Sequence, residues 1–579
     1  MTIFEVWAPK PDTVELEVNG QRHPMRADES GWWRVDVPGI EAGSDYAFVL
    51  DGGLPRPDPR SAWQPQGVHG PSRLVDHDAF AWTDQQWRGV PLAGNVLYEL
   101  HVGTFTEEGT FDAAVGRLDH LADLGVSAVE LLPCSAFAGR WGWGYDGVAW
   151  YAVHDPYGGP DGLKRFVDAC HARGIGVVMD AVYNHLGPAG NYLPEFGPYL
   201  TEAHTTPWGP AVNLDMAGSD EVRRYIIGNA RMWLHDYHID GLRLDAVHAL
   251  VDGRATPLLE ELAVEVQALG ARLRKPLWLV AESDTNDPRV VTSRAAGGLG
   301  LDGQWADDVH HALHATLTGE RAGYYGDFGS LPTLAKALTG VFVHDGTWSS
   351  FRGRTHGRPV PPTLDGHPFV VYLQNHDQVG NRATGDRIAS SLSDGMLQIG
   401  AALVLTSPYT PMLWMGEEWG ARTPWLFFSD HEGELGEAVR QGRRAEFASH
   451  GWDTSGVPDP QSPDTFQKSK LDWSEAADER GCRLRDWNRD LIALRRTLPD
   501  LADGHRHRVQ VTYDEDARWL VVRRGRTAVA CNLAPERQAV PLAGTPDAVL
   551  LANRPGFVFR DGFVELDGES VAILDLLRS

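Results

Sequence analysis

The sequence predicts an α/β protein built on a (β/α)8 barrel, the TIM-barrel fold, with one small β-sandwich before the barrel and another after it. Three observations lead to this prediction. Strand-like and helix-like segments alternate over about 400 residues in the middle of the chain. Short strands with alternating polarity occupy both ends of the chain. Polar side chains recur directly after the predicted central strands, where barrels carry their functional groups.

Residues 1–90 are expected to form the first β-sandwich. Short runs of alternating apolar and polar residues at 4–9, 14–20, 31–39 and 45–52 are separated by turn residues. A proline-rich stretch at 52–67 then leads away from them. No internal repeat or low-complexity segment interrupts the chain.

Residues 91–498 are expected to form the barrel, with insertions. Strands are predicted at 95–102, 126–133, 175–182, 241–247, 277–283, 369–375 and 411–416, and helices at 110–125, 162–174, 220–237, 257–269 and 491–501. The run at 175–182 is apolar on both faces, as parallel strands are when helices cover the sheet. A doubly wound open sheet is the alternative, but no GxGxxG motif or P-loop follows an early strand.

Residues 499–579 are expected to form the second β-sandwich. Alternating runs at 508–513, 518–533 and 569–576 predict hairpins, and the turn at 523–526 joins two of these strands. The fold class is therefore a barrel flanked by two β-domains.

Composition narrows the classes of function. The chain has 579 residues, enough for about three or four domains, and its formal net charge is −27. This charge argues against nucleic acid as a partner, because phosphate binding needs basic patches. No apolar run reaches the length of about 18 residues that predicts a membrane span. The interpretation is a protein that binds neutral ligands.

The start of the chain and its cysteines predict a cytoplasmic location. The first residues lack the basic and apolar regions of a signal peptide. Cys134, Cys170, Cys482 and Cys531 are scattered and lack metal-ligand spacing, which predicts reduced thiols and no zinc site.

Four predicted strand ends carry polar or charged side chains. These are Asp180, Asn184 and His185 after the third strand, Arg243, Asp245 and His248 on the fourth, Glu282 and Asp284 on the fifth, and His376 and Asp377 on the sixth. Taken singly, an aspartate at a strand end is usually a helix cap or turn former, and an arginine–aspartate pair can be a structural ion pair. The repetition on four strands favours a shared site.

Paired carboxylates near aromatic residues suit glycoside hydrolysis. One carboxylate attacks the anomeric carbon while another acid protonates the leaving oxygen. Tyr145 and Asp146, on a glycine-rich loop, offer an aromatic platform, although such a loop can also be a surface turn. A metalloprotease is disfavoured because HExxH is absent, and a serine hydrolase because no GxSxG follows a strand.

The four groups resemble the signature regions of the α-amylase family of glycoside hydrolases. They read DAVYNH (180–185), GLRLDAVH (241–248), LVAESD (279–284) and YLQNHDQ (372–378), in that order. The resemblance implies a barrel followed by a C-terminal β-sandwich. It also implies that Asp245 is the nucleophile, that Glu282 is the general acid/base, and that Asp377 is the third carboxylate.

The resemblance extends to substrate-binding residues. It implies that Arg243 keeps Asp245 ionised, that His185 and His376 bind hydroxyl groups in the −1 subsite, and that Tyr145 stacks under the sugar ring there. Glu282 is expected to hold a proton, and retention of configuration implies that its carboxyl lies about 5–5.5 Å from that of Asp245. No metal ion and no cofactor are expected.

Further segments resemble the branch of the family that contains branching, debranching and trehalose-releasing enzymes. They include VWAP near the N-terminus, QWADDVHHALHATLTGE (304–320) and MLWMGEEWG (412–420). The first β-sandwich would then be like a carbohydrate-binding module. The implied ligands are maltooligosyltrehalose, trehalose and maltooligosaccharides, with a synthase as functional partner.

The acceptor side of the site is expected to differ from that of amylases. Many amylases have a lysine–histidine pair where this chain has His248 and Ala249. Contacts on this side are assigned to Asp284, Asp307, His310, Gln378 and Asn381, and Glu417 and Glu418 either line the cleft or are structural. The alternatives are a branching or debranching enzyme, disfavoured because branching enzymes usually carry HDE in place of HDQ, and a non-catalytic glucan-binding protein, disfavoured because all three carboxylates are present.

Overall fold

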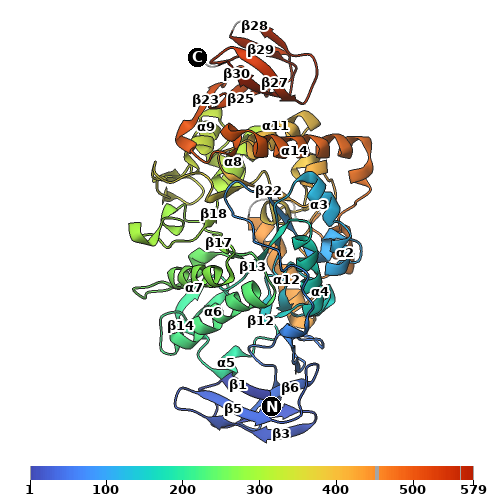
Figure 1. Ribbon diagram of the computed structural model, residues 1–579, viewed down its shortest axis with the longest axis vertical. Helices are drawn as coiled ribbons and strands as arrows, with labels where there is room; N and C mark the ends of the chain where they lie inside the picture. Colours follow the sequence, from blue (N-terminus) through green and yellow to red (C-terminus); the bar gives the residue numbers. More distant parts are fainter. Residues whose placement is uncertain (1, 450–455, 561, 578–579) are drawn as a thin grey trace.

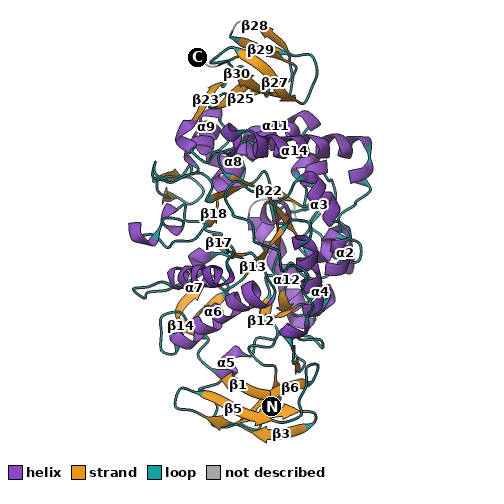
Figure 2. Ribbon diagram, viewed as in Figure 1, coloured by secondary structure: helices purple, strands orange, loops and turns teal. Residues whose placement is uncertain are grey.

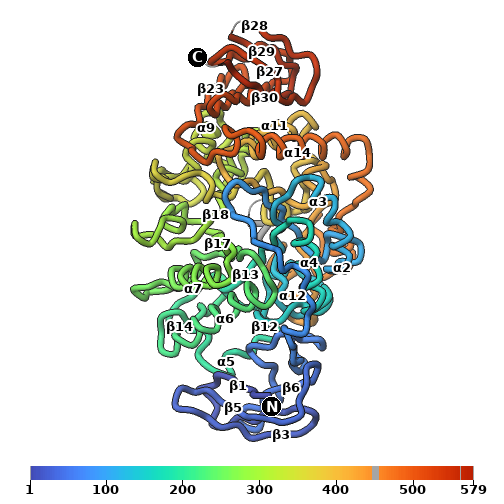
Figure 3. The backbone as a smooth tube through the Cα atoms, viewed as in Figure 1, coloured from blue at the N-terminus to red at the C-terminus, as the bar shows by residue number. Residues whose placement is uncertain are grey.

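A closed barrel lies in the middle of the molecule, with a β-domain at each end (Figure 1). The structure is a computed structural model that describes residues 2–449, 456–560 and 562–577. The trace in Figure 3 begins in one β-domain and finishes in the other, at opposite ends of the molecule. The predicted fold class is confirmed.

Eight parallel strands form the barrel in chain order, and β9 closes it by pairing with both β10 and β22. They are β9 (Leu97–Leu100), β10 (Ala128–Leu131), β13 (Gly176–Ala181), β16 (Gly241–Leu244), β17 (Trp278–Ala281), β18 (Gly303–Trp305), β21 (Phe369–Val371) and β22 (Thr410–Trp414). Because all eight are parallel, their carboxyl ends meet at one mouth.

The sequence predicted seven of these strands and missed β18. This strand has only three residues and lies between Asp302 and Asp307, so no apolar run marks it, whereas the equally short β21 belongs to the apolar run at 369–373. Trp305 nevertheless packs into the barrel's interior cluster with Trp278 and Tyr372. The pairing of β18 with β17 and β21, and not its own sequence, makes it a strand.

Helices cover the outside of the barrel (Figure 2). The main ones are α3 (Leu118–Leu124), α4 (Gly159–His171), α6 (Ser219–Asp236), α7 (Leu258–Leu273), α8 (Asp307–Thr318), α11 (Asp394–Leu405) and α14 (Glu479–Thr497). The helix predicted at 110–125 is divided into α2 (Phe111–Val115) and α3, and Gly125 ends α3 in the left-handed conformation. None of the described helices is both long and apolar enough to cross a membrane.

The N-terminal β-domain consists of two sheets. One sheet has the order β1 (Thr2–Trp7), β5 (Trp32–Val37), β4 (Arg26–Ala27), and the other is built around β2 (Val14–Val18) and β6 (Asp45–Leu50). Trp7 packs edge-on against Tyr199 of a barrel insertion at 5.2 Å, and Arg56 pairs with Glu195 on α5 (Leu193–Phe196). These contacts dock the domain on the barrel.

The C-terminal β-domain also consists of two sheets. A five-stranded sheet contains β24 (Trp519–Arg524), β25 (Thr527–Asn532) and β30 (Ser570–Leu576). A three-stranded sheet contains β26 (Gln538–Pro541), β28 (Val558–Arg560) and β29 (Phe563–Leu566). Arg524 is buried and donates to the carbonyl oxygens of Thr406 and Ser407, at the end of α11. Positive charge at a helix C-terminus is favourable there, so this arginine ties the domain to the barrel.

The amino ends of the strands carry a buried charge cluster far from the mouth of the barrel. Asp240, directly before β16, accepts from Trp87 at 2.7 Å and from the backbone of Val177 at 2.9 Å. His171 lies 2.9 Å from Asp240 and 2.8 Å from Asp84, one carboxylate at each ring nitrogen. Burial lowers the pKa of His171, but the two carboxylates outweigh burial and raise it above its ordinary value. A cationic His171 therefore joins the linker before the barrel to the barrel itself.

We expect His171→Gln to lower the melting temperature, because Asp84 and Asp240 lose the cation that they share and keep only His238 and Lys275 as charged partners. The pKa of His171 is raised in the folded state, so its contribution is fully present below the unfolded value of about 6.5 and is lost as the pH rises through the folded value. The deficit measured by calorimetry should therefore be larger near pH 6 than near pH 10. The control His235→Gln, on an exposed histidine of α6, should leave the melting temperature unchanged. Equal deficits at both pH values would contradict a cationic His171.

Candidate active site

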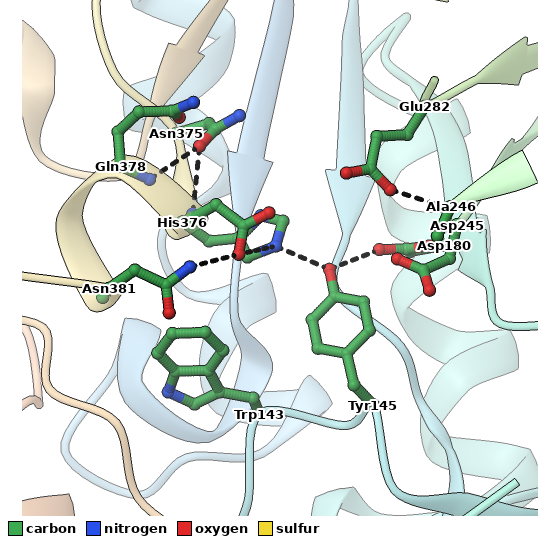
Figure 4. A network of polar contacts seen from close by, with 12 residues as sticks. Trp143, Tyr145, Asp180, Asp245, Ala246, Glu282, Asn375, His376, Gln378 and Asn381 are labelled. Carbon is green, nitrogen blue, oxygen red and sulfur yellow. Dashed lines mark hydrogen bonds and ion pairs between the residues drawn. The ribbon is translucent and has the colours of Figure 1, made fainter. Parts of the chain in front are cut away.

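The carboxyl ends of β13, β16, β17 and β21 bring the predicted residues together (Figure 4). Asp180 lies on β13 and Arg243 on β16, and Asp245 and Glu282 directly follow β16 and β17. Asp377 is on α10 (His376–Gly380), which begins five residues after the end of β21 and is capped by the side chain of Asn375. The site is thus assembled from elements far apart in the sequence.

The chain turns sharply immediately after Asp245. Ala246 has φ 39°, a left-handed conformation that is rare for a residue with a side chain. Its backbone N–H donates to Oε2 of Glu282 at 2.7 Å, and the N–H of Val247 donates to the Glu282 carbonyl at 2.9 Å. The strained turn therefore links the two predicted catalytic carboxylates through the backbone.

Arg243 joins three carboxylates from neighbouring strands. Its Nη1 lies 2.6 Å from Asp180 and 2.9 Å from Asp245, and its Nη2 forms an ion pair with Glu282 at 3.2 Å. The side chain is fully buried, and its guanidinium lies 4.4 Å from the ring centroid of Trp305. A planar guanidinium suits this role because its donors are fixed in direction.

The proton of the Asp245–Glu282 pair is distributed differently from the sequence-based expectation. Burial and the nearby Glu282 carboxylate raise the pKa of Asp245 well above its ordinary value, despite Arg243. Burial raises the pKa of Glu282, but Arg243 and the Ala246 N–H outweigh burial and lower it. The pair therefore favours the proton on Asp245, whereas we expected from the sequence that Glu282 would hold it. The sequence could not show this difference, because the hydrogen bond from the Ala246 N–H to Glu282 forms only in the folded protein.

His376 is held by a glutamate that the sequence analysis did not include. Glu99 on β9 lies 2.5 Å from Nδ1 of His376 and accepts the His376 backbone N–H at 3.0 Å. The other ring nitrogen lies 2.9 Å from the Tyr145 hydroxyl and 3.5 Å from Asp377. Burial lowers the pKa of His376, but Asp377 and Glu99 raise it to about 9. The signal for Glu99 was a lone glutamate in an otherwise apolar strand.

Aromatic side chains form the walls of the site. Tyr145 stacks on His376 with ring centroids 5.3 Å apart, and its hydroxyl donates to Asp180 at 2.7 Å. His185 stacks on Trp208 at 4.7 Å, and Trp208 is 48% exposed. Trp208 was not predicted, because it lies in a hairpin insertion between barrel elements.

A cavity of about 420 Å³ opens beside Asp377, and we call it the acceptor cleft. The residues predicted for this side that line it are Asp284, Asp307, Gln378 and Asn381. Among the lining residues that were not predicted are Tyr324, Phe351 and Arg352. Arg352 pairs with Asp284 across the cleft wall. These three lie in insertions after β18, where no strand end marks them.

Hydrogen bonds connect the side chains within the acceptor cleft. Asn381 donates to Asp377 at 3.1 Å, and Gln378 lies 3.4 Å from Asp307. Asp307 also accepts the hydroxyl of Tyr372. Burial raises the pKa of Asp307 to about 7, although the Tyr372 hydrogen bond opposes the shift. The cleft therefore combines a weakly acidic carboxyl with amides and aromatic faces.

The two remaining predicted histidines occupy different environments. His248 is exposed, and its Nδ1 lies 3.3 Å from the backbone nitrogen of Asp284. His310 is fully buried, with one ring nitrogen 2.7 Å from the carbonyl of Leu373 and the other 2.9 Å from the hydroxyl of Tyr325. Both nitrogens of His310 are thus engaged inside the protein, behind the acceptor cleft.

Glu418 is structural and faces away from the mouth of the site. Its carboxylate accepts from Tyr98 at 3.1 Å and lies 2.8 Å from His120 on α3. Burial raises the pKa of its neighbour Glu417 to about 8. Within the described residues, no group of three or more His, Cys, Asp or Glu side chains is arranged to hold a metal ion.

Two family models match the chain. The model of the α-amylase catalytic domain matches residues 74–198, and a domain of unknown function, DUF3459, matches residues 504–573. Among solved structures, the chain resembles a putative α-amylase from Salmonella typhimurium, with 38% identity, a TM-score of 0.90, and coverage of 99% of this chain and 97% of that one. A pullulanase from Paenibacillus barengoltzii shares the fold at 20% identity and a TM-score of 0.73, over 100% of this chain and 94% of that one.

Curated relatives match over nearly the whole chain. A malto-oligosyltrehalose trehalohydrolase from Arthrobacter ramosus is 57% identical over 99% of both chains. Its namesake from Mycobacterium tuberculosis is 53% identical over 99% of both, and that from Deinococcus radiodurans is 43% identical over 95% of this chain and 90% of its own. With this identity along the whole length, and with the α-amylase signature residues gathered at one end of its barrel, the chain belongs to the malto-oligosyltrehalose trehalohydrolase family.

Proposed function

We propose that the protein is a retaining α-glycoside hydrolase that cleaves the α-1,4 bond next to the terminal trehalose of maltooligosyltrehalose. The observation that carries the hydrolase assignment is the Arg243 guanidinium, which holds Asp245 and Glu282 side by side at the mouth of the barrel. Two carboxylates so placed suit double displacement. The trehalose preference is supported by the names of the relatives, which are 43–57% identical.

In the first step of this proposal, Asp245 attacks the anomeric carbon while Glu282 protonates the oxygen of the departing sugar. The proton must therefore move from the Asp245 side of the pair to Glu282. Coupled carboxylates exchange a proton as one unit, so loss of the Ala246 contact on substrate binding would favour this transfer. Asp377, supported by Asn381, would hold sugar hydroxyls.

The −1 subsite in this proposal is formed by Tyr145, His185, Arg243 and His376. His376 is cationic below its pKa of about 9 and can donate a charge-assisted hydrogen bond to a sugar hydroxyl. Tyr145 is fixed by His376 and Asp180, so its ring is preorganised to face a sugar. Fixed partners lower the entropy that substrate binding would otherwise cost.

The acceptor cleft would receive the trehalose unit. Tyr324 and Phe351 offer aromatic faces, and Asp284, Asp307, Gln378 and Asn381 offer polar groups for its hydroxyls. His248, beside Asp284, would lie at its edge, and His310 would act only through the residues that it supports. Branching or debranching activity is not favoured by the relatives, and a non-catalytic role does not explain the coupled carboxylates.

The place of action is also part of the proposal. The four cysteines are all free thiols, three of them buried, which supports a reducing compartment such as the cytoplasm. An enzyme with this substrate requires another enzyme that converts the reducing end of a maltooligosaccharide into trehalose. We therefore propose functional pairing with such a synthase.

The activity is tested with maltooligosyltrehalose as substrate. We expect the purified protein to release trehalose and a shorter maltooligosaccharide, resolved by anion-exchange chromatography. Maltooligosaccharides of equal length without a trehalose end serve as the control and should react more slowly. A glucan that gains or loses branches, with no trehalose released, would instead indicate the branching or debranching alternative.

Substitution of the two carboxylates should abolish turnover without unfolding the protein. Asp245→Asn and Glu282→Gln are each expected to lower kcat by at least about 10³-fold, because each group acts on the reacting atoms. Asp123→Asn, at an exposed position on the outer helix α3, is the control, and it should keep kcat within about threefold. Near-normal turnover of either carboxylate variant would remove that residue from the mechanism.

The alkaline limb of activity is expected to depend on Glu99. In the wild type, His376 stays cationic up to pH about 9, because Asp377 and Glu99 outweigh its burial. Removing one anion in Glu99→Gln should lower that pKa by about 1–3 units, so kcat/KM should begin to fall at correspondingly lower pH. Glu107→Gln, an exposed glutamate, is the control. An unshifted alkaline limb would mean that His376 is not the titrating group.

A further inference from the structure

A second cavity lies directly behind the acceptor cleft, and we call it the side cavity. Its volume is about 300 Å³. The two cavities share three lining residues, Glu320, Gln378 and Arg382. Two other lining residues, Gly319 and Ser391, are exposed, so the side cavity also reaches the surface. It therefore extends from the surface of the molecule to the wall of the acceptor cleft.

Two residues that line the side cavity carry buried polar atoms that lack a protein partner within the described part of the chain. Arg387 lines it with a side chain that is 1% exposed, and donates to the carbonyls of Thr423 and Met415 at 2.6 Å each. Its remaining nitrogen, Nη2, is buried without a hydrogen bond, and so is Oε1 of Gln378. Buried polar atoms of this kind are normally satisfied by water, because leaving them bare is costly.

The lining does not suit a sugar. The histidine rings of the side cavity are already occupied, because both nitrogens of His310 are engaged and His314 stacks on Tyr325 at 4.4 Å. A sugar subsite needs an open aromatic face, and the described lining offers none. A volume of about 300 Å³ corresponds to roughly ten water molecules at about 30 Å³ each. Water is the ligand that this lining favours.

The side chains of Glu320, Gln378 and Arg382 lie between residues of the side cavity and of the acceptor cleft, because they line both. Arg382 is fixed there by Glu320 at 3.1 Å and by Asp386 at 2.7 Å. Gln378 follows the predicted third carboxylate, Asp377, on the same short helix, and its Nε2 lies 3.4 Å from Asp307. A 3.4 Å contact is a weak hydrogen bond, so this amide is the loosest part of the wall.

We propose that the side cavity supplies the water for the second step of the reaction, entering past Gln378 while the released sugar still occupies the acceptor cleft. This inference rests on the proposed function. In that step the water oxygen forms a bond to the anomeric carbon. The bond from that carbon to the Asp245 carboxylate breaks and its electron pair returns to Asp245. The proton of the water passes to Glu282.

The water supply would decide between hydrolysis and transfer. A glycosyl group on Asp245 can pass to water or to the hydroxyl of another sugar. The product depends on which of the two reaches the anomeric carbon first. A sugar must enter through the acceptor cleft, whereas water has a route of its own. The side cavity thereby makes the enzyme a hydrolase even when sugar acceptors are abundant.

Variants at the outer end of the side cavity test this route. Ser391→Trp should block it, because Ser391 lines the cavity and is exposed, so the change leaves the core intact. Thr318→Leu, at the end of α8, narrows the cavity from another side. The matched control is Ser390→Trp, an identical change at the neighbouring exposed serine, which does not line the cavity.

The measurement is the ratio of transfer to hydrolysis products at high acceptor concentration, together with kcat and KM. We expect Ser391→Trp to raise the transfer fraction at least about threefold and to lower kcat and KM together. The value of kcat/KM should not change, because it reports only the steps up to the glycosyl-enzyme. Thr318→Leu should act in the same direction, and Ser390→Trp should match the wild type.

A transfer fraction equal to that of Ser390→Trp would overturn the proposal. A fall in kcat/KM with an unchanged product ratio would also overturn it, by assigning the cavity to substrate binding. The ratio is measured with a plain maltooligosaccharide donor as well as with maltooligosyltrehalose. A wrong trehalose assignment would appear as a lack of trehalose release by the wild type, which is distinct from a failure of the water route.

Discussion

The buried guanidinium of Arg243 organises the rest of the site. It contacts Asp180, Asp245 and Glu282, which come from three successive strands, so one side chain fixes the relative positions of three carboxylates. Carboxylates this close repel one another, and burial alone would force them to take up protons. A fully buried arginine also needs anionic partners, because an unpaired charge inside a protein is costly. The carboxylates therefore need the cation of Arg243, and Arg243 needs their negative charge.

The catalytic residues and a cluster that stabilises the barrel lie at opposite ends of its strands. At the carboxyl ends of the strands, the buried side chains of Glu99 and His376 pair beneath the site. At the amino ends, His171 and Asp240 form a closed cluster that joins the linker to the barrel. The left-handed Ala246 lies at the functional end, where the hydrogen bonds of Glu282 hold it. Left-handed residues also occur near the amino ends, because His238 and Arg274 (φ 57° each) precede β16 and β17.

Much of the fold and of the candidate site could be predicted from the sequence. Seven barrel strands were visible because each lies in a run of apolar residues long enough to show its pattern, whereas β18 is short and flanked by aspartates. Asp245, Glu282 and Asp377 were visible because they directly follow, or lie shortly beyond, such strands. Glu99 sits within a strand, and Tyr324, Phe351 and Arg352 sit in long insertions, so position along the chain gave no sign of their role.

The sequence by itself determined which residues could carry the chemistry, since spacing of two along a strand puts Arg243 and Asp245 on one face. It also determined the order of barrel and β-domains, because hydrophobic periodicity is a local property. Only the tertiary structure decided which carboxylate of the pair favours the proton, since that depends on the Ala246 N–H reaching Glu282 from another strand. It alone decided that His310 lies buried behind the acceptor cleft and that Gln378 separates two cavities. The burial of a side chain and the electrostatic field around it depend on atoms that are distant in the chain, so no local sequence pattern encodes them.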